Sequence, residues 1–444
     1  MKFRGLLIAT IVLAALTGTL YWSNHRKPPE TTGTASADTP PKILTLNQGD
    51  VIGIAIKKKS GEDVTLGKTD SGQWQITAPK SLAADQDAVT SMLSSLSSLN
   101  SDRLVDDKAT NLDQYGLVPP SIEVDITKKG KTTVKLLIGD NTPTGSAAYA
   151  AVTGDPRVFT LATYNKSNFD KGPNDLRDKR LLTFDSDKLS RLELSAKKQT
   201  IEFGRNKDQW QIEKPKPLRA DSFQVDELVR SVHDAKMELS ATDDDKKTAA
   251  AFSSGSATAS VKITDISGTQ ELQVRKNKDD YYAKSSAIAG VYKITSGTAA
   301  ALDKNLDDFR NKKLFDFGYA DPEKIEIHDG AKTVVVTRSG ADWLSNGAKM
   351  DVPSVTTLIG VVRDLSASKF PDNGFTSPAI EITVTSNDGK RIEKALLSKD
   401  GDAYVAKRDN EPALYEIAAS SVTELQNAAA SLKPAEVKPA PTKK

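Results

Sequence analysis

The feature that most constrains this chain is a tryptophan that returns at nearly equal intervals. Trp74, Trp210 and Trp343 are separated by 136 and 133 residues, and the first two stand in the same four letters, QWQI. Self-similarity at a fixed period is typical of a repeated structural unit. At 444 residues, the chain is also too long for a single ordinary core. We therefore expect an array of similar units.

Each tryptophan is followed by the pattern of a capped amphipathic helix. Asp85, Asp221 and Asp351 come shortly after the three tryptophans, and aspartate is a favoured helix N-cap. Apolar residues then recur at i, i+3, i+4, i+7 and i+10, which places them on one face of a helix. These positions are Val89, Met92, Leu93, Leu96 and Leu99; Val225, Leu228, Val229, Val232 and Ala235; and Val355, Leu358, Ile359, Val362 and Leu365.

The second half of each unit has the alternation of β-strands. VFTL (158–161), VYKI (291–294) and LYEI (414–417) alternate in this way, and turn signals such as KKGK and SNDGK favour antiparallel hairpins. The predicted unit has strands up to the tryptophan, a proline-marked turn, a capped helix and a meander of strands. The fold class is therefore α+β, with three tandem repeats of an antiparallel-sheet-plus-helix unit.

The N-terminal segment has the pattern of one transmembrane helix. Lys2 and Arg4 precede an uncharged run of 18 residues from Gly5 to Trp22, which as a helix reaches about 27 Å. A cleaved signal peptide is the alternative, but no small-x-small cleavage site follows the run. We expect an uncleaved single-pass anchor, with the globular part on the extracytoplasmic side.

Composition and repeat spacing together divide the chain into six segments. They are an anchor (1–27), a flexible Pro/Thr/Ala-rich tether (28–42), repeat unit 1 (43–180), repeat unit 2 (181–313), repeat unit 3 (314–432) and a disordered tail (433–444).

Composition also excludes several functions. With 61 Lys+Arg against 59 Asp+Glu, the chain has no global charge that would draw nucleic acid. It has no cysteine, and its three histidines, His25, His233 and His328, lack metal-ligand spacing. We expect no cofactor and no metal. No recognisable catalytic constellation appears, so we also expect the protein not to be an enzyme.

Two basic junctions are candidate partner contacts. LRDKRLLTF (176–184) and FRNKKLFDF (309–317) close the first two units. The basic residues are Arg177, Lys179, Arg180, Arg310, Lys312 and Lys313. Solvated charge beside the next unit's first strand is the favoured interpretation, and an anion or partner contact is the alternative.

Aromatic residues offer a second functional interpretation. Tyr149, Tyr282 and Tyr404 each stand in a short strand-like segment of their unit and could present platforms for a glycan. Ordinary packing in a half-buried sheet is the favoured interpretation. For Trp74, Trp210 and Trp343 we predict a structural role, covering the seam between sheet and helix, because the third copy, DWLS, loses both glutamines and keeps the ring.

Several of these motifs carry a family resemblance. Trp74-Gln75-Ile76 with Pro79, then Asp85 and its helix, then YGLVPPSIEV (115–124) and LRDKRLL occur in order. Over roughly residues 43–430 the chain resembles the bacterial family called domain of unknown function 4340. YGLVPP has only a partial echo at NGFTSP (373–378) and is lost in the middle unit. The resemblance implies a membrane-anchored extracytoplasmic protein, often encoded beside ABC-2-type transporter components similar to those of gliding-motility systems. It implies no known catalytic residues.

The favoured functional hypothesis is a non-enzymatic, membrane-tethered extracytoplasmic scaffold or adaptor. With the bacterial setting that the resemblance implies, we expect a single-pass protein of the inner membrane with its globular part in the periplasm. Its expected partners are the membrane, through the single N-terminal anchor, and subunits of an ABC-type export or gliding-like system. The alternative is a module that binds cell-envelope glycan.

Overall fold

The computed structural model describes residues 41–206, 209–240, 244–317, 322–409 and 411–436. The predicted anchor and nearly all of the predicted tether lie outside these residues. Within the described part of the chain, no helix is both long enough and apolar enough to cross a membrane. The chain divides into two compact units, of which the first ends at Asp178 and the second starts at Lys179.

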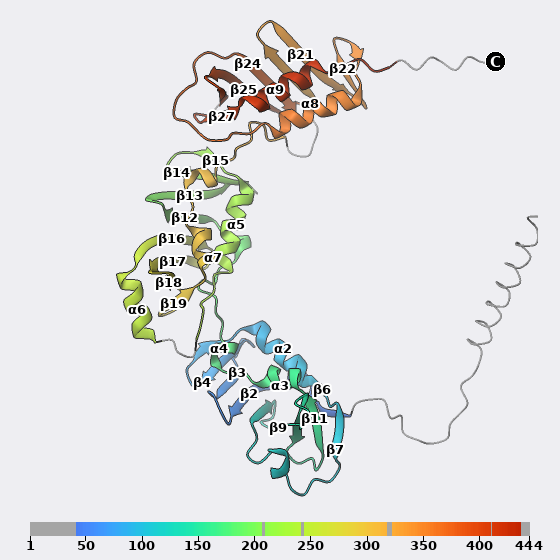
Figure 1. Cartoon of the computed structure of the whole chain (residues 1–444), viewed down its shortest axis with the longest axis vertical. Helices are drawn as coiled ribbons and strands as arrows, with labels where there is room; N and C mark the ends of the chain where they lie inside the picture. The colour runs from blue at the N-terminus through green and yellow to red at the C-terminus, as the bar shows by residue number, and fades with distance from the viewer. Residues whose placement is uncertain (1–40, 207–208, 241–243, 318–321, 410, 437–444) are drawn as a thin grey trace, which may run out of the picture. The chain divides into compact units, whose positions relative to one another are not determined.

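The first compact unit contains one large antiparallel sheet (Figure 1) with the strand order β5-β4-β3-β2-β8-β9-β10-β11-β7. A two-stranded sheet, β1-β6, accompanies it. The strands are β1 Lys42–Thr45, β2 Val51–Lys58, β3 Val64–Lys68, β4 Trp74–Ala78, β5 Leu82–Ala83, β6 Ser98–Asn100, β7 Arg103–Asp106, β8 Ile122–Lys128, β9 Thr133–Asn141, β10 Ala147–Val152 and β11 Val158–Ala162. The helices are α2 Gln86–Ser97, α3 Thr163–Phe169 and α4 Pro173–Leu176, with short 3-10 turns at Gln48–Asp50 and Asp113–Tyr115.

The second compact unit contains two eight-stranded antiparallel sheets. The first of them has the order β15-β14-β13-β12-β16-β17-β18-β19. Its strands are β12 Arg191–Ala196, β13 Gln199–Asn206, β14 Gln209–Lys214, β15 Leu218–Arg219, β16 Ser256–Asp265, β17 Gly268–Asn277, β18 Asp280–Ser285 and β19 Val291–Ile294. Its helices are α5 Ser222–His233, α6 Asp245–Ser254 and α7 Ser296–Leu302, with 3-10 turns at Ser186–Lys188 and Leu306–Asp308.

The other sheet repeats this arrangement as β23-β22-β21-β20-β24-β25-β26-β27. Its strands are β20 Lys324–Asp329, β21 Lys332–Ser339, β22 Asp342–Ser345, β23 Ala348–Lys349, β24 Ile380–Ser386, β25 Arg391–Asp400, β26 Ala403–Arg408 and β27 Leu414–Ala418. Helices α8 Val352–Asp364 and α9 Ala419–Ala430 pack against each other. The mixed α+β class with antiparallel sheets is therefore confirmed: the described residues form four such sheets and eight α-helices.

The three long helices begin where their sequence predicts. Asp85, Asp221 and Asp351 each accept hydrogen bonds from backbone N–H groups of the first helical turn, which would otherwise lack a partner. The predicted apolar faces of α2, α5 and α8 are buried. Along the strands buried residues alternate with more exposed ones, as in β12, so that each sheet turns one face to its helices.

The tryptophans differ from the prediction in one respect. They were expected to end a strand, but Trp74 opens β4, and Trp210 and Trp343 are the second residues of β14 and β22. The physical reason is the preceding turn, where Gly72 has a φ of 81° that favours glycine, so that the strand resumes only after it.

The expected equivalence of the three tyrosines is wrong. In the hairpin β18–β19, Tyr281 lies opposite Ile294, and in β26–β27, Tyr404 lies opposite Ile417. Tyr404 therefore corresponds to Tyr281, not to Tyr282. In unit 1 the matching position, opposite Leu161, is Ala148. Tyr149, opposite Thr160, does match Tyr282, opposite Lys293. A shift of one residue moves a side chain to the other face of a sheet, so Tyr404 lies on the opposite face from the other two, and the three tyrosines share no common surface.

Buried apolar side chains form one large cluster in each compact unit. In the second unit a single cluster runs from Leu181 to Ala428 and includes residues of both sheets. The two sheets are therefore joined by a continuous core as well as by the chain.

Candidate functional site

The segments between repeats are hydrogen-bonded on two sides. In the first junction, the Asp178 N–H donates to the Ala83 carbonyl at 2.8 Å, and the Leu181 N–H donates to the Ala235 carbonyl at 2.9 Å. In the second, the Asn311 N–H donates to the Arg219 carbonyl and the Leu314 N–H to the Leu365 carbonyl, both at 3.0 Å. Each junction thus covers an edge strand of the preceding repeat and the end of the next repeat's helix.

The same arrangement appears at both ends of the described array. Strand β1 pairs with β6 just after helix α2, and residues 42–46, KILTL, have the same burial pattern as RLLTF (180–184). KLFDF (313–317) follows the same pattern except at Asp316, which is half-buried. At the other end, the Asp351 N–H donates to the Lys433 carbonyl at 2.9 Å and the Ala435 N–H to the Lys349 carbonyl at 2.8 Å. Residues 433–435 therefore belong to repeat unit 3, which corrects the predicted start of the tail.

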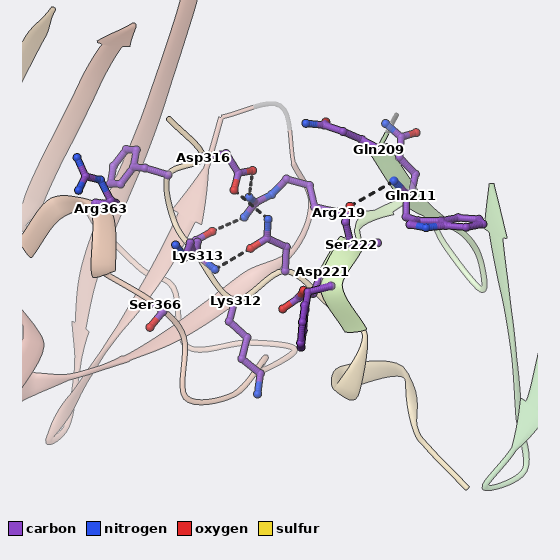
Figure 2. Close-up of a pocket in the computed structure, with 15 residues that line it drawn as sticks. Gln209, Gln211, Arg219, Asp221, Ser222, Lys312, Lys313, Asp316, Arg363 and Ser366 are labelled. Atoms are coloured by element: carbon purple, nitrogen blue, oxygen red, sulfur yellow. Dashed lines mark hydrogen bonds and ion pairs between the residues drawn. The ribbon is translucent and has the colours of Figure 1, made fainter. Parts of the chain in front are cut away.

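Arg219 makes the second junction different from the others. It lies at the end of edge strand β15, and its side chain contacts residues of repeat unit 3 (Figure 2). Nη1 is 2.5 Å from Asp316 Oδ2 and Nε is 3.1 Å from Glu411 Oε2, while Nη2 donates to the Lys313 carbonyl at 2.5 Å. The guanidinium also lies over the ring of Tyr415, 5.7 Å from its centroid, and Nη2 is 3.1 Å from the Tyr415 hydroxyl. Tyr415 itself donates to Glu411.

Further charges extend this cluster into repeat unit 3. The Asp316 N–H donates to the Glu393 carboxylate at 3.1 Å. Glu393 also accepts from Arg408 Nη2 at 2.8 Å and pairs with Arg391 Nε at 3.2 Å. The Glu393 and Arg408 side chains are only 5% and 11% exposed, so the pair is largely shielded from water. We call Arg219, Asp316, Arg391, Glu393, Arg408, Glu411 and Tyr415 the junction cluster.

Ionisation in the junction cluster follows from burial and pairing. Burial acts to raise the pKa of Asp316, but the positive charge of Arg219 and hydrogen bonds from Asn311 and Arg219 outweigh it, so the pKa is lowered. Burial raises the pKa of the Tyr415 hydroxyl to about 12, with Arg219 opposing the rise and Glu411 adding to it. Asp316 is therefore held as an anion and Tyr415 as a neutral phenol at neutral pH.

A recess of about 560 Å³ lies beside the junction cluster (Figure 2). Its wall combines strand β14, the start of α5, the second junction and the end of α8. The lining residues are Gln209, Trp210, Gln211, Arg219, Ala220, Asp221, Ser222, Phe223, Asn311, Lys312, Lys313, Phe315, Asp316, Arg363 and Ser366. We call this the junction recess.

The six predicted junction cations do not form one site. Lys312 and Lys313 are exposed and line the junction recess. Arg310 is buried: it lies 3.5 Å from the ring centroid of Phe370 and pairs with Asp307 at 3.2 Å. Its position favours a packing role over a partner contact.

The cations of the first junction have other surroundings. Arg177 is half-buried and forms a β-bridge with Ala84, Arg180 forms one with Lys236, and the Lys179 carbonyl accepts from the Met237 N–H at 2.8 Å. The structure therefore groups Lys312 and Lys313 with Arg219, a residue that was not among the candidates.

The proposed repeat anchors occupy matching positions. Trp74, Trp210 and Trp343 are 6%, 3% and 6% exposed. Lys68 lies over the ring of Trp74, and Arg205 lies over the ring of Trp210. The Trp210 indole N–H also donates to Asp226 Oδ1 of helix α5 at 2.7 Å. These contacts place the ring of Trp210 between sheet and helix.

The junction cluster was visible in the sequence only as a set of differences between repeats. By strand register, four uncharged residues match four charged ones: Ala83 matches Arg219, Thr183 matches Asp316, Gln270 matches Glu393 and Ser285 matches Arg408. The one readable signal was the aspartate in FRNKKLFDF where LRDKRLLTF has threonine.

The described residues contain no group of three or more His, Cys, Asp or Glu side chains placed to hold a metal ion. His233 and His328 lie apart, beside Asp234 and Thr333 respectively. The chemistry available at the junction recess is therefore ion pairing, amide hydrogen bonding and apolar contact.

Comparison with known proteins identifies a family but no function. No curated protein matches the sequence. Two solved structures show a faint likeness to this chain. One is a DNA polymerase III subunit beta from Pseudomonas aeruginosa, with 8% sequence identity and a TM-score of 0.15; the match covers 87% of this chain and 94% of that chain. A DNA polymerase sliding clamp with ligand from the same organism, at 9% identity and a TM-score of 0.14, covers 84% of this chain and 93% of its own. At these TM-scores the likeness carries no argument.

The family model described as "Domain of unknown function (DUF4340)" matches residues 74–217 and 210–380, which together span most of the sequence. The chain belongs to the DUF4340 family.

Proposed function

We propose that this protein is a non-enzymatic scaffold or adaptor, tethered to the bacterial inner membrane by its N-terminal segment, with the repeats in the periplasm. Its partners in this proposal are subunits of an ABC-type export or gliding-like transport system. The observation that carries the proposal is the joint between repeat units 2 and 3, where Arg219 of one repeat is held by Asp316, Glu411 and Tyr415 of the next.

A scaffold must hold its binding surfaces at a fixed separation. A guanidinium with four partners has little rotational freedom, and removing it leaves carboxylates in a partly buried place. The continuous apolar cluster from Leu181 to Ala428 adds to this restraint. Together they make two repeats act as one body, which an adaptor needs and an isolated binding domain does not.

The state of the titratable groups supports a non-enzymatic role. Asp316 and Glu411 are paired with Arg219, and Glu393 with Arg408. A carboxylate that is already paired, with a pKa kept low as at Asp316, is poorly suited to exchange protons near neutral pH.

Glycan binding remains the second candidate, but no observation favours it. Its aromatic platforms, Tyr149, Tyr282 and Tyr404, are half-buried, and Tyr404 is not equivalent by register to the other two. The Tyr149 ring packs against Tyr115 with centroids 5.1 Å apart, which favours packing over presentation to a ligand.

Crosslinking in native membranes tests the proposal. A full-length chain with a photo-crosslinking residue at Phe223 is expected to capture transporter subunits, which quantitative mass spectrometry would identify. A matched chain with the crosslinker at Ile266, an exposed residue in the β16–β17 hairpin, is the control. Recovery of no transporter subunit above that control would rule the proposal out.

A further inference from the structure

We propose that the junction recess binds an acidic segment of a partner protein, whose carboxylates pair with Lys312 and Lys313 and whose apolar side chain packs on Phe223. The inference rests on the proposed adaptor function, because it names the class of partner segment that the site would take. Three features of the recess carry it: an excess of positive charge, an exposed aromatic ring and exposed amides.

The charge excess follows from how the local carboxylates are used. Asp316 is occupied by Arg219 and by Asn311, which donates to it at 2.9 Å. Asp221 caps helix α5 by accepting from the Gln224 N–H. Lys312 and Lys313 are exposed, and neither forms an ion pair with any residue that the structure describes. Two lysine charges in the recess are thus left to attract an external anion.

The aromatic ring gives the site an apolar element. Phe223 is 67% exposed and lies in the first turn of α5. The matching residues after the other caps are Asp87 and Pro353, so a capped helix does not require an aromatic side chain there. A single exposed apolar residue is ordinary on its own, but beside two lysines it adds the apolar half of a mixed contact.

The exposed amides favour a peptide as the occupant. Gln209 and Gln211 flank the buried Trp210 on β14, and both amide side chains are exposed and line the recess. A side-chain amide donates and accepts, as a peptide backbone requires. Ser222 and Ser366 add hydroxyl groups to the same wall. A volume of about 560 Å³ is within the usual range for binding pockets.

Peptide binding can be measured directly on the purified full-length chain. The probe is a fluorescein-labelled nine-residue peptide of alternating glutamate and phenylalanine, followed by fluorescence anisotropy. The comparison peptide has glutamine in place of every glutamate. We expect the acidic peptide to bind, and the Lys312→Glu/Lys313→Glu variant to weaken it by about tenfold or more, because two attractive contacts become repulsive. Phe223→Ala is expected to weaken it by a few-fold.

The chain offers a matched control for the charge reversal. Lys179 and Arg180 hold the same sequence positions in the first junction as Lys312 and Lys313 in the second. The Lys179→Glu/Arg180→Glu variant therefore carries the same change of net charge outside the recess. Peptide affinity should be unchanged in this control, and far-ultraviolet circular dichroism should show that every variant is folded.

Several results would overturn the inference. These are absence of binding, equal binding of the glutamine peptide, or equal loss in the two charge-reversed variants. Preferential binding to vesicles of phosphatidylglycerol that depends on Lys312 would assign the recess to a lipid surface. A dimer lost in the Lys312→Glu/Lys313→Glu variant on ultracentrifugation would assign it to a second copy. Peptide binding without transporter subunits in the membrane crosslinking experiment would refute only the proposed transport partner.

Discussion

The two junctions between repeats share a backbone arrangement and differ in charge. In the first, the Thr183 N–H donates to the Gln270 side-chain oxygen at 2.9 Å, and in the second the Asp316 N–H donates to Glu393. Ser285, which matches Arg408 by register, donates to the Leu181 carbonyl, whereas Arg408 donates to Glu393. The same backbone N–H is therefore satisfied by a neutral side chain in the first junction and by a charged one in the second.

This difference shows what the charges add. Neutral residues suffice to attach a junction to its repeat, so the ions are not needed for that purpose. The charged residues instead surround the side chain of Arg219 and pair with it. The residue at the matching position near the first junction is Ala83. The division into two compact units falls at the first junction, between Asp178 and Lys179, and not at the second. An ion cluster of this kind contributes specificity of docking more readily than net stability.

The largest expected effect concerns what the repeats have in common. Trp74→Ala and Trp210→Ala should each lower the free energy of unfolding of their repeat by about 3–5 kcal/mol, because each removes a buried aromatic ring. Urea denaturation followed by circular dichroism measures both losses. Trp210→Phe, which keeps a buried ring and loses the bond to Asp226, should be milder. Unchanged denaturation midpoints would mean that the rings do not support the seam between sheet and helix.

The next effect separates the two junctions. Arg219→Ala should lower the unfolding free energy of the second compact unit by about 2–3 kcal/mol, since it leaves Asp316 and Glu411 without their main cation in a partly buried place. Faster proteolysis around residues 311–317 should accompany the loss. The control is Lys349→Ala, at the matching position of repeat unit 3, which removes an exposed ion pair to Asp342. Equal losses of unfolding free energy in the two variants would show that the pairing of Arg219 does not hold repeat units 2 and 3 together.

A third test converts one junction into the other. A variant with Arg219→Ala, Asp316→Thr, Glu393→Gln and Arg408→Ser carries the residues of the first junction, and Glu411→Gln is added because Glu411 would otherwise lose both of its arginine partners. The loss of unfolding free energy should be smaller than that of Arg219→Ala, about 1 kcal/mol, because no largely buried charge is left unpaired. Thermal unfolding of both variants gives the comparison. A greater loss in the fivefold variant would mean that the charges are required for the fold itself.

The smallest effect is a dependence on pH. Because the folded-state pKa of Asp316 is lowered, its contribution is complete above the ordinary aspartate pKa of about 3.9 and is lost as the pH falls below that value towards the lowered one. Over that pH interval, acid titration should therefore lower the unfolding free energy of the native chain more than it lowers that of an Asp316→Asn variant. Parallel titration curves would show that Asp316 is not coupled to Arg219 in solution.

Local patterns predicted much of the fold. The aspartate caps and apolar spacing identified α2, α5 and α8, because capping and amphipathicity depend on residues close in sequence. Strand register was less accessible, since it is set by pairing with distant strands. Tyr404 was therefore misaligned by one residue relative to Tyr149 and Tyr282.

The site depended on contacts that no local pattern contains. Arg219 and Glu411 are far apart in the sequence, and each alone looks like an ordinary surface charge. The lysines of FRNKKLFDF could be identified because they are adjacent, but the recess around them also needs β14, α5 and α8. Ion clusters of this kind become visible only after folding brings the repeats together.

The junction segments have a consequence for behaviour at high concentration. Edge strands β5, β15 and β23 each receive a hydrogen bond from the segment that follows their repeat, at Ala83, Arg219 and Lys349. An uncovered strand of this kind is a template for pairing with another molecule and for aggregation. In the proposed membrane-tethered state many copies would share one plane, and these hydrogen bonds would then hinder edge strands of neighbouring molecules from pairing with one another.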